Sequence, residues 1–192
     1  SFPTRRSSDL RFECFDYESV RWLQLHIRNA DRPVTVSAVG ARRRRYPWPQ
    51  APQVRCADAA IQQVWDAAVN TLHNAGQETL VDGMGRERQQ YSGDIGHALH
   101  ALFYAFGDTR LPARFVHTYS QGLTKDGFFL DCWPAYDRLA RLAERQLDLT
   151  PWGPLLDHGV GFNFDCWYYY LYTGDREPLR EVYPRLLVFA NY

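Results

Sequence analysis

The sequence has few cysteines and no closely spaced cysteine pair. Its four cysteines are Cys14, Cys56, Cys132 and Cys166. Zinc sites and the disulfide frameworks of small domains use cysteines at short, regular spacings. The wide spacing therefore argues against both, and we expect buried free thiols.

The sequence also lacks an excess of either charge and lacks a long apolar run. Its 22 Lys and Arg residues are balanced by 22 Asp and Glu residues. A neutral balance gives no electrostatic reason to expect nucleic acid or an anionic membrane as a partner. No apolar run reaches the ~20 residues that a membrane-spanning helix needs, and no signal peptide is visible. Four consecutive arginines at 42–45 lie outside any recognisable nucleic-acid-binding motif, so we interpret them as a solvated strand end.

Aromatic residues, by contrast, are plentiful: 6 Trp, 12 Tyr and 11 Phe in 192 residues. Their faces suit sugar rings, whose C–H surfaces pack against them, but they suit a hydrophobic core equally well. The length is sufficient for one domain with a substantial core.

Both ends of the sequence have the character of cut ends. Residues 1–10 (SFPTRRSSDL) resemble the translation of a common sequencing-adapter oligonucleotide, and we exclude them from fold reasoning. Residues 179–192 (LREVYPRLLVFANY) read as an amphipathic helix without a Gly cap or polar tail. A natural helical C-terminus is the alternative, but we expect a fragment.

The first part of the chain has strand character. Residues 20–27 and 34–39 alternate, or nearly alternate, between apolar and polar side chains, with turn residues at 29–33. We predict that residues 11–48 are a β-hairpin from the end of a β-sandwich domain. Three prolines then predict a stiff linker at 49–57.

From Asp58 onwards the apolar period becomes helical. Asp58 is placed as an N-cap. One face of the first predicted helix carries apolar residues: Ile61, Val64, Trp65, Ala68, Val69 and Leu72. Further helices are predicted at about 95–106, 112–121, 136–147, 162–172 and 178–192.

One helix–Gly-Asp–helix pattern occurs twice. Gly107-Asp108 and Gly174-Asp175 each follow one predicted helix and precede another. Each Gly is suited to end a helix in the left-handed conformation, and each Asp to cap the next helix. The repetition is typical of an array of helical hairpins, of which this chain would supply about half of a closed ring. Two coincidental helix turns are the alternative.

The densest polar cluster is DGMGRERQQYSGD at 82–94. Glycines at 83 and 85 disfavour a continuous helix, so a loop is expected to gather the side chains of Asp82, Glu87 and Asp94. Glycoside hydrolysis needs a protonated carboxyl beside the leaving oxygen and a second carboxylate. Neighbouring carboxylates would favour the protonated form of Glu87, whereas Arg86 and its neighbour at 88 would favour the ionised form. A surface loop of salt bridges is the alternative.

This segment resembles the active-site motif of the α-L-rhamnosidases of glycoside hydrolase family 78. An Asp, a small turn, Arg-Glu-Arg, an aromatic residue and Gly-Asp follow in order, and the approach through a Pro-bearing linker is also similar. The resemblance covers about residues 11–192. It implies a mainly α fold: a partial (α/α)6 barrel of the six-hairpin glycosidase type at 58–192, preceded by the β-hairpin.

The resemblance also implies roles for individual residues. Glu87 would be the general acid, Asp82 and Asp94 would bind sugar hydroxyls, and Arg86 would hold the carboxylates or a hydroxyl. The reaction would invert the anomeric centre, with a catalytic base outside this chain, so we expect the chain alone to be inactive. Tyr91 departs from the pattern, since many members have Trp there.

Two loop tryptophans are further candidates for sugar binding. Trp133 and Trp152 lie in turn-like segments, where they would either stack on rhamnose or pack against neighbours. Asp157, followed by His158, is interpreted as a helix cap rather than a substrate contact. His97 and His100 lack further ligands in reach, so no metal and no cofactor is expected.

The resemblance thus implies a glycosidase that removes terminal α-L-rhamnose, with a rhamnose-containing glycoside or oligosaccharide as its partner. Another six-hairpin glycosidase with a different sugar specificity is one alternative. A non-catalytic helical-toroid carbohydrate-binding module is the other.

Overall fold

A computed structural model of the 192-residue chain describes residues 11–13, 17, 19–85, 87–134 and 155–192. The chain divides into two compact units, residues 1–36 and residues 37–192. Three of the features predicted above fall outside the described residues: Arg86, Trp152 and the helix at 136–147.

The predicted β-hairpin is not borne out. Among the described residues of 11–48, none is assigned to a strand, and the side chains of Trp22, Leu25 and Val36 are exposed. An isolated two-stranded hairpin is marginal in water because it has no second layer on which to bury its apolar face. Alternation of side chains therefore did not suffice here to form strands.

The arginine run at 42–45 is exposed, as predicted, but it is not the end of a strand, and two of its side chains contact the first helix, α1 (Ala59–Ala75), and the residues after it. Arg43 donates hydrogen bonds to the side chains of Asn70 and Asn74, and Arg44 forms an ion pair with Glu78. These side chains stay exposed, so the contacts fix the path of the chain more than they add stability.

The segment that follows the arginines also packs on the helices. The ring of Trp48 lies 4.5 Å from that of Phe106, centroid to centroid, and the Trp48 side chain is close to Gly76. Tyr46 and Trp48 both pack against the main core. The chain is thereby anchored near the end of α1.

Helix α1 starts as predicted, but only part of its predicted apolar face is buried. The Asp58 side chain accepts hydrogen bonds from the backbone N–H groups of Ala60 and Ile61, which confirms the N-cap. Val69 and Leu72 pack against the core, whereas Ile61 and Val64 are exposed. No neighbour in the described residues covers the first turns of this face.

The other helices occur where the helical period predicted them. They are α2 (Ser92–Ala101), continued by the π-helical turn η1 (Leu102–Phe106), then α3 (Arg110–Ser120), α5 (Leu156–Thr173) and α6 (Glu177–Ala190).

The repeated Gly-Asp pattern is confirmed in both copies. Gly107 (φ 59°) and Gly174 (φ 67°) end their helices in the left-handed region, which costs glycine little. The Asp108 carboxylate accepts a hydrogen bond from Leu111 N–H, and the Asp175 carboxylate accepts one from Glu177 N–H. The two turns therefore connect η1 to α3 and α5 to α6 by the same local means.

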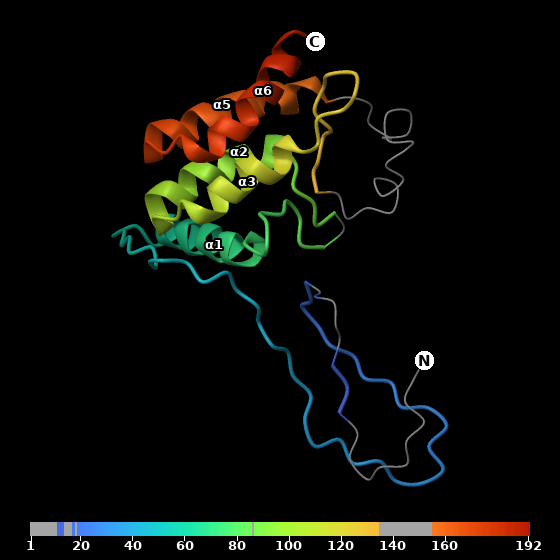
Figure 1. Ribbon diagram of the computed structural model, residues 1–192. Coiled ribbons are helices and arrows are strands. Elements are labelled where there is room, and N and C mark those ends of the chain that lie inside the picture. The colour runs from blue at the N-terminus through green and yellow to red at the C-terminus, as the bar shows by residue number, and fades with distance from the viewer. Residues whose placement is uncertain (1–10, 14–16, 18, 86, 135–154) are drawn as a thin grey trace. The chain divides into compact units, whose positions relative to one another are not determined.

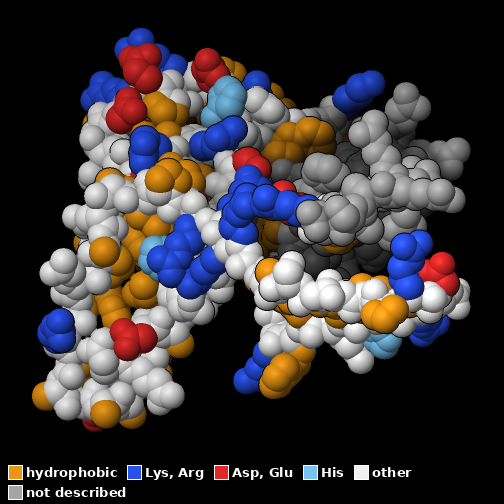
Figure 2. Space-filling view, turned by 90° about the horizontal axis from the view of Figure 1, so that it is seen from below, with side chains coloured by type: hydrophobic (Ala, Val, Ile, Leu, Met, Phe, Trp, Pro, Cys, Tyr) orange, Lys and Arg blue, Asp and Glu red, His pale blue; other side chains and the backbone are white. Residues whose placement is uncertain are grey.

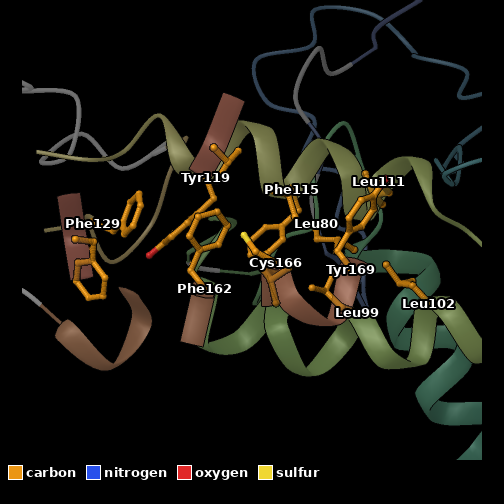
Figure 3. Close-up of a cluster of buried hydrophobic side chains, with 14 of the residues drawn as sticks. Leu80, Leu99, Leu102, Leu111, Phe115, Tyr119, Phe129, Phe162, Cys166 and Tyr169 are labelled. Atoms are coloured by element: carbon orange, nitrogen blue, oxygen red, sulfur yellow. The ribbon is translucent and has the colours of Figure 1, made fainter. Parts of the chain in front are cut away.

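The helices of residues 37–192 stack in layers, with α1 against the pair α2 and α3, and with α5 and α6 beyond that pair (Figure 1). Helix α2 packs mainly on α5, and α3 mainly on α6. Between them lies a core of aromatic rings, in which Phe115, Tyr119 and Phe162 meet (Figure 3). This core holds the N-terminal ends of α2 and α5 at a fixed separation.

Hydrophobic side chains also reach the surface. Figure 2 shows them interspersed with Lys and Arg on the face that it presents. On α5 the exposed apolar residues follow one stripe at helical spacing: Leu156, Val160, Phe164, Trp167 and Leu171. In the described part of the chain no helix is both long and apolar enough to span a bilayer.

Candidate active site

The polar motif forms a closed loop between α1 and α2. Asp82 and Gln89 pair across its base: Asp82 N–H donates to the Gln89 carbonyl oxygen, and Gln89 N–H donates to Asp82 Oδ1, each at 3.0 Å. Arg88 N–H donates to the Gly83 carbonyl at 2.9 Å, with Arg88 itself at a positive φ of 55°. One oxygen of Asp82 therefore stabilises the loop that carries the other candidates.

Glu87 folds back over this loop. Its side chain is half-buried, and Oε2 lies 3.5 Å from the position that a Cβ on Gly83 would occupy. Arg88 Nε donates to the Met84 carbonyl oxygen at 3.2 Å, within the same loop. The predicted convergence of Asp82 and Glu87 is thus supported by geometry.

Tyr91 is a partly buried phenol on which several acidic groups act. Burial raises the pKa of its phenol well above the usual value, and the negative charges of Asp131, Glu87 and Asp82 raise it further, as does Cys132. The hydroxyl therefore keeps its proton at neutral pH and remains a hydrogen-bond donor. The phenol and a carboxyl are the groups that a sugar hydroxyl or a glycosidic oxygen would meet here.

Asp94 lies apart from this group. It is exposed in the first turn of α2, and it is not among the charges that act on Tyr91 in the described residues. At that position its carboxylate complements the positive end of the helix dipole. Asp82 and Asp94 are both close to Glu87 in sequence, but of these two only Asp82 is among the charges that act on Tyr91.

The second wall of the site comes from residues 122–133, far along the chain from the motif. Tyr91 and Cys132 form an antiparallel backbone bridge. The buried side chain of Gln90 donates to the Trp133 carbonyl oxygen at 2.7 Å, and Trp133 N–H donates to the Gln90 carbonyl at 3.2 Å. Cys132 Sγ donates to Gln89 Oε1 at 3.0 Å. These bonds hold the two segments side by side.

Trp133 is consequently adjacent to the motif, as a sugar-binding residue would have to be. Its side chain is half-buried, packs partly against the core and lies close to Gly122. One part of the ring is thus used in packing.

Asp131 is a site residue that the sequence reasoning missed. It is buried, and burial raises the pKa of its carboxyl, an effect that Cys132 N–H and His158 partly oppose. The signal was present in the sequence: an acidic residue directly after the apolar run 128–130 is an acid placed in a protein interior. The sequence pattern was instead interpreted through the neighbouring Trp133.

His158 is the second residue that was missed. It lies in the first turn of α5, its ring packs edge-on against Tyr91 with centroids 6.0 Å apart, and its Nδ1 is 3.0 Å from the Asp131 carbonyl oxygen. Asp157, predicted to cap this helix, lies inside its first turn instead, and it is exposed. The helix begins six residues earlier than predicted, so that His158 lies in its first turn, next to Tyr91.

Groups suited to a metal do not gather in the described residues: no cluster of three or more His, Cys, Asp or Glu side chains has the arrangement to hold an ion. Of the two histidines on α2, His97 is exposed and His100 lies 3.4 Å from the Tyr172 hydroxyl. Cys56, Cys132 and Cys166 are free thiols, and Cys14 lies outside the described residues.

Comparison with known proteins gives a consistent result. In fold, the chain is similar to the family 78 rhamnosidase of Bacillus sp. GL1, with a TM-score of 0.64 and 18% identity over 77% of this chain and 14% of that one. It is also similar to a rhamnosidase from Klebsiella oxytoca solved with rhamnose bound, with a TM-score of 0.60 and 21% identity over 74% of this chain and 26% of that one. A search of curated proteins found no match.

The sequence comparison assigns the family. The model of the bacterial α-L-rhamnosidase six-hairpin glycosidase domain matches residues 49–192, which include the whole motif loop and every helix described above. The chain spans a small part of the length of the solved rhamnosidases. It belongs to the family of the bacterial α-L-rhamnosidase six-hairpin glycosidase domain.

Proposed function

We propose that this chain carries the proton-donating half of an inverting α-L-rhamnosidase site, with Glu87 as general acid. The observation that carries the proposal is the loop geometry: Glu87 Oε2 lies against Gly83, next to Asp82, and Tyr91 is bridged to Cys132, next to Asp131. An acid that must give a proton to a leaving oxygen benefits from partial burial, and Glu87 is half-buried.

The other groups have complementary roles. The Tyr91 hydroxyl donates a hydrogen bond to a sugar oxygen or to Glu87, and Trp133 presents the exposed part of its ring to the sugar. Asp94 binds a sugar hydroxyl, and Arg86 holds the carboxylates or a hydroxyl. The substrate is a terminal α-L-rhamnoside, a proposal supported by the family and by the rhamnose in the Klebsiella oxytoca structure.

The stereochemistry of the reaction follows from the role of the second carboxylate. In an inverting enzyme this group activates a water molecule on the opposite face of the sugar, about 6.5–9.5 Å from the acid. Asp82 and Asp131 belong to the acid side of the site. Asp82 accepts a hydrogen bond from the Gln89 backbone N–H, and Asp131 is buried. We place the base outside these 192 residues, in the remainder of an (α/α)6 barrel, and expect the chain alone to bind sugar without hydrolysing it.

The test uses the complete protein that carries this sequence and a panel of aryl glycosides. The rhamnoside should be hydrolysed fastest, and Glu87→Gln should lower its kcat by about 10² to 10⁴ while L-rhamnose binding is retained. Glu177→Gln, which changes an exposed acid on α6, is the matched control and should be fully active.

Three results would argue against parts of this proposal. Faster release from another sugar would replace the substrate. A Glu87→Gln variant with wild-type turnover would remove the acid role. Rhamnose binding without turnover in the wild-type complete protein would indicate a carbohydrate-binding module instead.

A further inference from the structure

Three segments that are distant in the sequence meet at His158. Its Nδ1 is 3.0 Å from the Asp131 carbonyl oxygen, in the segment 122–133. Its own carbonyl oxygen accepts a hydrogen bond of 2.8 Å from the Ser92 hydroxyl at the start of α2. Its ring contacts Tyr91 at nearly a right angle, with an interplanar angle of 87°. One residue thus connects α5 to both walls of the acid site.

The contact with Asp131 defines which ring nitrogen carries the proton. A carbonyl oxygen only accepts hydrogen bonds, so Nδ1 must donate, and in the neutral imidazole Nε2 is then the unprotonated nitrogen. This orients the ring plane, because the donor must point at the Asp131 carbonyl. The orientation is what brings the ring edge-on to Tyr91.

The other side of the ring is equally constrained. His158 Nε2 lies 2.8 Å from the position that a Cβ on Gly93 would occupy, which is closer than a real Cβ contact. The glycine of the Tyr-Ser-Gly-Asp sequence is therefore required by the imidazole that packs on it. His158 has no room to rotate towards α2 without losing the Asp131 bond.

Tyr91 is in turn confined between this ring and the carboxylates. Its backbone is paired with Cys132, and the charges of Asp131, Glu87 and Asp82 act on its hydroxyl. A shift of the imidazole would open space beside the phenol and allow it to leave the carboxylate group. The position of the hydroxyl therefore depends on a hydrogen bond made by a different residue.

We propose that His158 is a positioning residue of the acid site: its hydrogen bond to the Asp131 carbonyl and its packing on Gly93 hold the Tyr91 ring in place at the end of the loop that carries Asp82 and Glu87. The proposal deepens the function proposed above and rests on it for its effect on sugar binding. Its structural part does not depend on the identity of the sugar.

The functional test measures L-rhamnose binding to the 192-residue chain by calorimetry. His158→Phe keeps an aromatic ring but loses the donor, and it should weaken binding about tenfold, the effect of one lost hydrogen bond. His158→Asn places an amide N–H near the same carbonyl and should restore affinity to within about threefold of wild type. His97→Phe, at an exposed histidine of α2, is the matched control and should bind like wild type.

A rescue by Asn separates positioning from bulk packing, because Asn fills the site less well than Phe. If Phe binds as tightly as wild type, or if Asn is weaker than Phe, the positioning role is overturned. Gly93→Ala should reproduce the loss seen with Phe, since its Cβ displaces the imidazole.

A second measurement uses the wild-type chain alone and avoids any effect of substitution on folding. Two-bond ¹H–¹⁵N correlation spectra should show the neutral His158 ring protonated at Nδ1, with cross-relaxation between its ring protons and those of Tyr91. Protonation at Nε2 would overturn the proposal whatever the sugar does. A wild-type chain that shows the Nδ1 form but binds no rhamnose would instead count against the proposed function and leave the positioning geometry established.

Discussion

The carboxylate of Asp165 on α5 lies directly against Gly96 on α2. Asp165 Oδ1 is 2.6 Å from the position that a Cβ on Gly96 would occupy, and Oδ2 is buried without a hydrogen-bond partner among the described residues. Helices α2 and α5, which carry Ser92 and His158 in their first turns, thus pack closely around a buried acidic side chain.

This acid should make the stability of the chain depend on pH. Burial raises the pKa of Asp165 from 3.8 to about 7, and the neighbouring Ser92 hydroxyl opposes the shift. Because the folded-state pKa is the higher one, the stabilising contribution is complete below pH ~4 and is lost as the pH rises through about 7. Asp165→Asn, which stays neutral, should remove this dependence.

The expected difference is on the order of 2–4 kcal/mol in the free energy of unfolding. Urea unfolding of both forms at pH 4.5 and pH 7.5 measures it: wild type should lose stability relative to the Asn variant at the higher pH. Parallel behaviour of the two forms across this range would contradict the prediction.

A methyl group at Gly96 should separate the same two helices. Its Cβ would overlap Asp165, which is buried and has nowhere to move, so Gly96→Ala should destabilise by about 1–3 kcal/mol despite the better helix propensity of Ala. Gly40→Ala, where a Cβ meets nothing within 4 Å, should change the unfolding free energy by less than about 0.5 kcal/mol. Equal stability of the two variants would show that α2 and α5 are less closely packed than described.

Substitution of Gly174 should change the stability of the chain through backbone conformation alone. A Cβ there meets nothing within 4 Å, but φ is 67°. Gly174→Ala should therefore cost about 1 kcal/mol, and Gly174→Asn less, because Asn tolerates the left-handed region. Thermal unfolding of both variants tests this order, and an Ala variant at least as stable as Asn would refute it.

The exposed stripe on α5 should promote association of the isolated chain. Phe164 and Leu171 are each more than half exposed, and contiguous apolar surface favours association. Replacing both residues with Lys should lower the binding of a dye that recognises exposed apolar surface. It should also reduce self-association in sedimentation experiments, while the helix content measured by circular dichroism stays unchanged. A loss of helix content would show instead that these side chains stabilise the fold.

Local features of this fold were predictable because they depend on a few adjacent residues. The Asp58 cap and the two Gly-Asp turns need only one side chain and the next backbone N–H groups, and both turns formed as predicted. The apolar period likewise located α2, α3, α5 and α6 to within a turn or two. The motif at 82–94 pointed to Glu87 and Asp82 because a glycine-rich loop keeps neighbours in sequence near one another.

The tertiary structure alone decided which distant residues complete the site. Asp131 and His158 join Tyr91 only because the aromatic core fixes where the segment 122–133 and the start of α5 meet the motif loop. Asp94, close to Glu87 in sequence, lies apart because α2 begins before it and turns it to solvent. The alternating residues 20–27 did not form a strand, since strand formation needs a partner that the local sequence does not supply. Contacts within a turn are encoded locally, whereas contacts across a core depend on the packing of the whole chain.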